Sequence, residues 1–386
     1  MDHGTNRILF ALLRSAICGK PLSDAEKAQF SDAHLPALAE LAKNHDVIHL
    51  LALGLKQNAL GVEKQAELGR HILLAAYRQE QQSAVLEKLC RILESAEIAF
   101  LPLKGAVLRE YYPEGWMRTS CDLDILVREQ DVERAAAVLV GEGGYARGKK
   151  GSHDISLFAP NKTHVELHHK LMEEGRANSA AQVLNHVLER ARVRDNCRYW
   201  HEMPDELFYY YHIAHMAKHF VDGGCGIRPV IDLWLLDTIP DVDKKKRDEL
   251  LAAGNLLVFA NTVRKLSRVW FENEEHDPVT RQMEDYILRG GVYGNIENYV
   301  IVHQQKKGGR IKYALSKVFI RYDQIKFLYP ILQKHRWLTP FMQVRRWCRL
   351  IFCGHLRRSM NELKYNRNVS AADAANTQKF LSDIGL

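Results

Sequence analysis

Two aspartates lie two residues apart in a short apolar stretch of the sequence. Asp122 and Asp124 alternate there with Leu123, Ile125 and Val127. Because side chains of a β-strand alternate between its faces, the pattern predicts a strand with both carboxylates on one face and the apolar side chains on the other. Two neighbouring carboxylates repel each other unless a cation lies between them. The pair therefore indicates a site for Mg²⁺, which carboxylates bind together with substrate phosphate oxygens.

A third carboxylate follows on another predicted strand. Residues 153–158 and 163–168 each alternate apolar and polar side chains, and the turn residues between them predict a β-hairpin. In the second strand, Glu166 shares a face with His164 and His168. A third carboxylate on the same sheet is what a two-metal site, or a metal with a general base, requires.

A candidate phosphate site precedes the aspartates. Residues 98–103 predict a buried strand, Lys104-Gly105 a turn, and residues 106–112 a helix. The free N–H groups at a helix N-terminus favour anions, Gly105 allows a phosphate to approach the backbone, and Lys104 adds a positive charge. A Lys-Gly pair alone rarely binds phosphate. Its place just before the aspartate strand is what indicates such a site.

Together these motifs resemble an uncharacterised bacterial nucleotidyltransferase family of the DNA polymerase β-like superfamily. The resemblance is carried by Lys104-Gly105, Tyr112-Pro113, Arg118, Asp122-x-Asp124, Gly144-Tyr145 and Glu166-Leu-His168. It implies a small mixed β-sheet backed by helices. It also implies transfer of a nucleoside monophosphate from a nucleoside triphosphate, with ATP the expected donor and Mg²⁺ or Mn²⁺ the cofactor.

The same resemblance implies roles for single residues. Asp122 and Asp124 would bind the metal ions, and Glu166 would be the third catalytic and metal-binding acid, either bridging to the attacking group or acting as its base. Lys104 and Gly105 would hold the β- and γ-phosphates. Arg118 would offset charge on the pyrophosphate leaving group, and Ser120 completes the predicted nucleotide contacts before the aspartates.

Three histidines form a separate candidate metal site. His212, His215 and His219 are spaced i, i+3, i+7 in a predicted helix and so share one face. Histidines spaced in this way can bind a transition metal. No HExxH motif or matching carboxylate accompanies them, which favours a polar stripe that lines the substrate cleft or is satisfied in packing. Asp232 and Lys218 are better candidates for contact with nucleotide or acceptor.

The rest of the chain reads as mainly helical, so the expected fold is α+β with a small mixed sheet. A length of 386 residues suggests two or three domains. We predict an N-terminal helical region (1–97), a nucleotidyltransferase core (98–170), a helical substrate-cleft domain (171–305) and a basic, aromatic C-terminal helical segment (306–386).

Composition points to the cytoplasm. The seven cysteines are odd in number and irregularly spaced, which favours a reducing compartment over a disulfide framework. The apolar run near the N-terminus is followed at once by Arg14 and lacks a cleavage site, so we expect an amphipathic helix and no signal peptide. No window reaches the ~18 apolar residues of a membrane span.

The net charge of +7 is concentrated near the C-terminus. Residues 306–367 carry sixteen Lys or Arg against two acids, and the remainder of the chain is net negative. The segment is expected to cover the acidic body, to bind nucleic acid through phosphate contacts and stacking, or to lie on an anionic membrane through an amphipathic helix such as 340–356.

Several functional alternatives stay open at this level. The acceptor is a small molecule or cell-envelope precursor, a protein side chain, or an RNA 3′ end. A non-catalytic adaptor that binds nucleotide with the same fold is the second function. A metallohydrolase built on the His212 stripe is the third, and it would bind zinc without needing Asp122.

Overall fold

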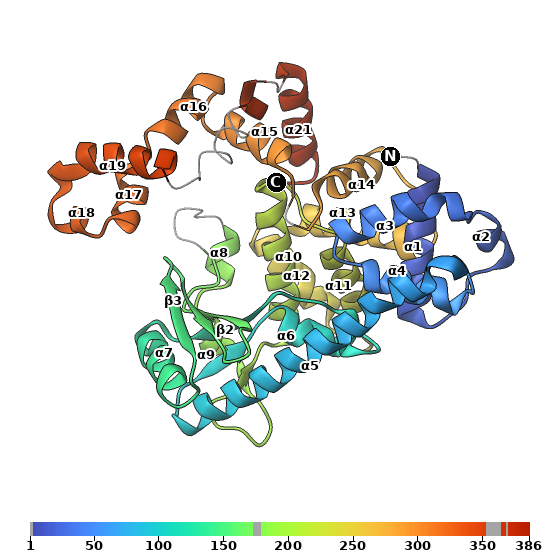
Figure 1. Ribbon diagram of the computed structural model, residues 1–386, viewed down its shortest axis with the longest axis horizontal. Coiled ribbons are helices and arrows are strands. Elements are labelled where there is room, and N and C mark those ends of the chain that lie inside the picture. Colours follow the sequence, from blue (N-terminus) through green and yellow to red (C-terminus); the bar gives the residue numbers. More distant parts are fainter. Residues whose placement is uncertain (1–2, 173–178, 293, 353–363, 368–369) are drawn as a thin grey trace.

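The computed structural model describes residues 3–172, 179–292, 294–352, 364–367 and 370–386. It is a mainly helical α+β structure with one five-stranded mixed sheet, as the sequence predicts. Figure 1 shows the sheet at one side of the molecule, with the long helix α5 (Gln65–Ser95) running beneath it toward the N-terminal helices. No helix in the described part of the chain is long and apolar enough to cross a membrane.

The main sheet has the strand order β1-β2-β5-β4-β3. Its strands are β1 (Phe100–Pro102), β2 (Asp122–Val127), β3 (Ala146–Lys150), β4 (Asp154–Phe158) and β5 (His164–His168). The predicted hairpin is the antiparallel pair β4–β5, and β2 pairs with β5 in parallel. Strand β3 was not predicted, because all five of its residues are exposed and it carries no apolar periodicity.

One face of this sheet is packed on helices. Leu123, Ile125 and Val127 of β2 join Val165 and Leu167 of β5 in a core with α5 and α7 (Val132–Gly141), and all five side chains are fully buried. The apolar half of each strand pattern is thus used for packing. The opposite face, which carries the polar half, is left for the candidate site.

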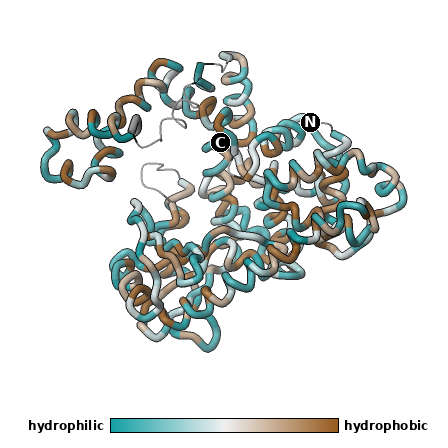
Figure 2. Tube along the Cα trace, in the orientation of Figure 1, coloured by the Kyte–Doolittle hydropathy of each residue, from teal (hydrophilic) through white to brown (hydrophobic). Residues whose placement is uncertain are grey.

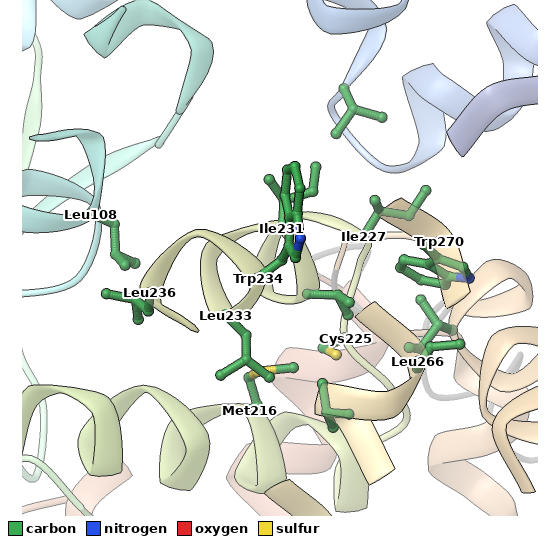
Figure 3. Close-up of a cluster of buried hydrophobic side chains, with 14 of the residues drawn as sticks. Leu108, Met216, Cys225, Ile227, Ile231, Leu233, Trp234, Leu236, Leu266 and Trp270 are labelled. Carbon is green, nitrogen blue, oxygen red and sulfur yellow. The ribbon is translucent and has the colours of Figure 1, made fainter. Parts of the chain in front are cut away.

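A second and larger core joins the N-terminal helices to helices that follow the sheet. It contains α1 (His3–Cys18), α3 (Leu35–Asn44), α4 (Ile48–Gln57), α10 (Asp205–Val221), α11 (Arg228–Asp237) and α13 (Leu257–Phe271). Figure 3 shows how Ile227, Ile231 and Leu233 of the α11 region lie between Met216 on one side and Trp270 on the other. The two predicted helical regions therefore share one apolar core.

Helix starts follow their local signals. Ser23 is the N-cap of α2 (Asp24–Ala28) in a capping box with Glu26, and Pro36 lies in the first turn of α3. The predicted helix after Gly105 is shorter than expected: α6 (Gly105–Leu108) gives way to a 3₁₀ turn, η3 (Arg109–Tyr111).

The expectation of helices alone after residue 172 was also incomplete, because β6 (Arg192–Val193) and β7 (His201–Glu202) form a small second sheet. Strands of two residues are too short to show the alternation of apolar and polar side chains from which a strand is predicted.

The remaining elements complete the helical parts. The helices are α8 (Ser179–Val183), α9 (Val187–Arg190), α12 (Lys244–Ala253), α14 (Pro278–Gly290), α15 (Ile296–Lys306), α16 (Arg310–Val318), α17 (Tyr322–Leu328), α18 (Ile331–Lys334), α19 (Thr339–Phe352) and α21 (Ala371–Asp383). The other 3₁₀ turns are η1 (Asp32–His34), η2 (Val62–Lys64), η4 (Gly115–Met117), η5 (Glu129–Asp131) and η6 (Arg336–Leu338). Of the predicted amphipathic helix 340–356, the part beyond residue 352 lies outside the described residues.

The buried His45, at the end of α3, predicts a loss of stability in mild acid. The ring is fully buried with Nε2 3.3 Å from the Leu288 carbonyl oxygen, and burial lowers the pKa of His45 to about 4. The unfolded chain binds a proton at this residue below about pH 6.5, whereas the folded chain does so only near pH 4. His45 therefore makes folding less favourable by up to about 3 kcal/mol as the pH falls from 6.5 to 4.

Urea unfolding of the wild type and of His45→Gln at pH 7 and pH 4.5 measures this effect. The glutamine amide can still donate to Leu288 and does not titrate. We expect the wild type to lose about 2–3 kcal/mol more than the variant between these pH values. Parallel losses in both proteins would contradict the assignment.

Candidate active site

Strand register brings the three predicted acids together. In the parallel pair β2–β5, Asp122 lies opposite His164 and Asp124 lies opposite Glu166. Paired residues of neighbouring strands project from the same face, so Asp122, Asp124 and Glu166 share the face that is not packed on α5 and α7. Asp124 is only 3 % exposed, while Asp122 and Glu166 are half-buried.

Two cationic groups are placed against these carboxylates. The Lys104 ammonium lies 3.1 Å from Asp124 Oδ1. His168 Nε2 lies 2.7 Å from the same oxygen and 3.2 Å from Glu166 Oε2, so the ring bridges β2 and its own strand. His168 lies on the face expected from strand alternation, but its local sequence does not predict this bridging role.

The three acids differ in pKa because these cations are unequally shared. Burial would raise the pKa of Asp124, but the hydrogen bond from His168 and the charge of Lys104 hold it at about 2. A hydrogen bond from His168 likewise lowers the pKa of Glu166. For Asp122, burial and then repulsion by Asp124 raise the pKa. Burial alone would lower the pKa of His168, but its hydrogen bonds to Asp124 and Glu166 raise it to about 8.

The donor set fits a hard divalent cation. Two groups of three side chains could each hold a metal ion, because within each group the three possible ligand atoms lie within 4.8 Å of one another. The first group is Asp122, His164 and Glu166, and the second is Asp124, Glu166 and His168. Glu166 belongs to both groups, as an acid that bridges two ions would. Carboxylate oxygens predominate, which suits Mg²⁺ or Mn²⁺ better than a soft metal. An added cation would also relieve the repulsion that raises the pKa of Asp122.

The Lys104-Gly105 turn connects β1 to the acids. Lys104 has φ of +44°, a backbone conformation rare for a residue with a Cβ atom, and its ion pair with Asp124 holds it there. A Cβ atom on Gly105 would lie 3.0 Å from Cβ of Ser120. The close approach of the turn to the segment that leads into β2 therefore favours glycine at position 105.

A buried arginine that the sequence analysis missed fixes this contact. Arg109 donates from Nε to the Gly105 carbonyl at 2.9 Å and from Nη2 to Gln82 Oε1 at 2.9 Å and to Ser120 Oγ at 3.2 Å. Ser120 also donates to Gln82. Ser120 thus has partners within the protein. Nothing in the local sequence distinguishes Arg109 from a solvated helix residue.

Two residues predicted to contact nucleotide bind one another. Arg118 donates to both carboxylate oxygens of Asp232, at 2.7 and 2.9 Å, and the Tyr112 hydroxyl donates to Asp232 at 2.7 Å. The Asp232 side chain is fully buried. This bidentate pair joins the segment before β2 to α11, across 114 residues of sequence.

All eight predicted site residues line one cavity of about 320 Å³, together with side chains of α10 and the start of α11. The predicted residues are Lys104, Gly105, Arg118, Ser120, Asp122, Asp124, Glu166 and Asp232. The other lining residues include His153, His168, Tyr211, His215, Lys218, His219 and Arg228. The volume lies at the lower end of the range for small-molecule sites.

The histidine stripe lines this cavity and does not form a metal site of its own. His212 Nε2 lies 2.9 Å from the Pro229 carbonyl oxygen, and His215 and His219 contact each other through Nε2 at 3.2 Å. Burial lowers the pKa of His212 and of His215, which keeps both rings neutral. Among the residues the structure describes, both groups of three candidate metal ligands lie at the sheet and neither includes this stripe.

Comparison with known families agrees with the resemblance seen in the motifs. A family model described as uncharacterised nucleotidyltransferase matches residues 31–272. The chain belongs to this nucleotidyltransferase family. The matched range begins before α3 and ends after α13, so it contains the sheet, the Arg118–Asp232 pair and every residue that lines the cavity except Val292. Searches among curated proteins and solved structures gave no significant match.

The Arg118–Asp232 pair predicts a large stability effect of one substitution. Asp232→Ala leaves a buried guanidinium without its carboxylate, so we expect a loss of about 3–5 kcal/mol in the free energy of unfolding. Asp248→Ala is the control, since Asp248 binds Arg264 in a half-exposed pair and should cost at most about 1 kcal/mol. Denaturant titration measures both. Equal, small losses would show that Asp232 is not held by Arg118 as described.

Proposed function

We propose that this protein is a Mg²⁺-dependent nucleotidyltransferase that transfers a nucleoside monophosphate from a nucleoside triphosphate, with ATP as the expected donor. The supporting observation is the convergence of Asp122, Asp124 and Glu166 on one face of two parallel strands, inside a cavity that also holds Lys104. Membership of the nucleotidyltransferase family supports the same reaction class.

The three carboxylates would hold one or two divalent cations. When bound, such ions neutralise phosphate charge and clamp the attacking and leaving oxygens. Asp124 and Glu166 are ionised at neutral pH even without a bound cation, because the pKa of each carboxyl is lowered. Asp122, which has no comparable cationic partner among its described contacts, gains most from an added charge.

Positioning accounts for most of the catalysis of phosphoryl transfer. Glu166 projects into the cavity beside Asp124, where its ionised carboxylate can accept a hydrogen bond from an acceptor hydroxyl and orient it. Its lowered pKa makes it a modest base, which suits a reaction in which little proton transfer is needed early. His168 fixes the Glu166 side chain by its contact at 3.2 Å.

Positive charge for the triphosphate comes from basic side chains that line the same cavity as the acids. Lys104 lies at the turn and Lys218 on α10, and both line the cavity. Arg118 and Arg228 also line it, but Asp232 and Asp46 respectively offset their charges, Arg228 lying 3.0 Å from Asp46. We assign phosphate contacts to Lys104, Lys218 and the Gly105 turn because all three line the cavity together with the acids.

Thermal unfolding with each of four nucleoside triphosphates tests the binding part of this proposal. We expect one or more to raise the melting temperature by several degrees in the presence of Mg²⁺, and EDTA to abolish the shift. Asp122→Asn should lose the shift without loss of fold, because it removes a carboxylate whose pKa is raised by burial and repulsion. Asp154→Asn, on strand β4, which pairs with β5, and outside the cavity lining, should keep it.

Transfer itself distinguishes the enzyme from a nucleotide-binding adaptor. We expect α-³²P-labelled nucleotide to label an acceptor fraction of a cell extract, with pyrophosphate released, and Asp124→Asn to lower the rate by at least a thousandfold. Label transfer that survives in this variant would contradict the carboxylate mechanism. Mg²⁺-dependent binding without transfer or pyrophosphate release would instead support the adaptor function.

A further inference from the structure

The helices from α16 to α19 form an arm that projects from the body of the molecule (Figure 1). We define this C-terminal arm as residues 310–352. The basic segment 306–367, to which the arm belongs, is expected from the sequence to cover the acidic body, to bind nucleic acid or to lie on a membrane. Figure 1 shows the arm extending away from the sheet and the N-terminal helices. We propose that the arm is a docking surface for anionic phospholipid membranes, a function independent of the proposed nucleotidyl transfer.

The arm is folded by specific contacts between its own helices. Gln343 Nε2 donates to the Ile320 carbonyl at 2.6 Å, and Trp347 Nε1 donates to the Val318 carbonyl at 2.8 Å. Phe319 packs edge-on against Trp347. These contacts fix α19 against the end of α16. The side chains that remain exposed are therefore presented by an ordered surface.

Apolar side chains are exposed in stripes along this surface. On α16, Ile311 (76 % exposed), Leu315 and Val318 follow one another at spacings of four and three residues, so they share one face. On α19, Phe341 (63 % exposed) and Val344 are spaced three apart. Four further exposed apolar residues lie on or between the helices of the arm: Phe319, Leu328, Ile331 and Trp337. Figure 2 shows hydrophobic (brown) and hydrophilic (teal) stretches alternating along the arm.

Basic side chains run beside the apolar stripes. Residues 306–352 contain twelve Lys or Arg and one acid, Asp323. Arg345 and Arg349 are exposed and lie four residues apart on α19. Each follows directly after an exposed residue, Val344 and Cys348 respectively, so the two arginines form a row beside the apolar stripe. An apolar face flanked by Arg and Lys is the pattern of helices that lie in a membrane interface.

An anionic lipid surface fits this combination better than the other occupants. Nucleic acid would use the positive charge but offers no apolar partner for aliphatic side chains such as Ile311 and Leu315. A second copy of the chain would cover the apolar stripes but would bring two strongly positive arms together, which electrostatic repulsion opposes. A phospholipid interface accepts the aliphatic side chains, suits Trp337 at headgroup depth, and supplies negative charge.

Co-sedimentation of the full chain with vesicles tests the proposal. We expect the chain to bind vesicles of phosphatidylcholine that contain about 30 mol % phosphatidylglycerol, and this binding to weaken as salt is added. Binding to vesicles of phosphatidylcholine alone should be at least tenfold weaker. Trp337→Ser/Phe341→Ser should weaken binding to the anionic vesicles at least tenfold. Arg345→Gln/Arg349→Gln should do the same, since each basic residue near such a surface contributes about fivefold.

Matched pairs on α5 and η2 serve as controls. Leu73→Ser/Tyr77→Ser removes two similarly exposed apolar side chains, and Lys64→Gln/Arg91→Gln removes two exposed charges. Both should bind vesicles as the wild type does. Three results would overturn the proposal: no binding to the anionic vesicles, equal losses in the control pairs, or arm-dependent binding of single-stranded RNA or self-association in place of vesicle binding.

Discussion

Repulsion among three carboxylates on one face of the sheet is the physical constraint on which the candidate site depends. The alternation of β2 and β5 that buries Leu123, Ile125 and Leu167 necessarily turns Asp122, Asp124 and Glu166 to the other side. Three carboxylates at that spacing destabilise the fold unless cations offset them. Lys104 and His168 offset Asp124 and Glu166 from within the chain, and Asp122 keeps a raised pKa. The remaining imbalance is the basis of the proposed divalent-cation site.

A second ion pair holds the walls of the cavity in place. Arg118 and Asp232 connect the segment that enters β2 to α11, and the shared apolar core joins α11 to the N-terminal helices (Figure 3). The acids on the sheet and the basic and histidine side chains of α10 therefore face one cavity although they come from segments far apart in sequence. Losing this pair would disturb both parts of the site together.

The sequence predicted the fold class and the placement of the three acids on one sheet face, because strand alternation at 122–127 and 163–168 is strong and local, and its motifs carried the resemblance to the family. It could not find β3, whose residues are all exposed, or the shortness of α6. Arg109 and the bridging position of His168 depend on contacts between distant segments, which no spacing reveals. Arg118 and Asp232 were recognised as polar residues of the site, but only the fold shows that they bind each other.

Mn²⁺ binding measured by electron paramagnetic resonance is the sharpest test of whether Asp122, Asp124 and Glu166 form a metal site. Free and protein-bound Mn²⁺ give different signals, and no acceptor is needed. We expect the wild-type chain to remove more free Mn²⁺ from solution than ATP alone does at the same concentration, and the amide of any one of the three acids to lower the affinity of the chain for Mn²⁺ at least tenfold. A wild-type chain that leaves millimolar Mn²⁺ free, or amide variants that bind it as tightly as the wild type, would contradict the assignment of Asp122, Asp124 and Glu166 as a metal site.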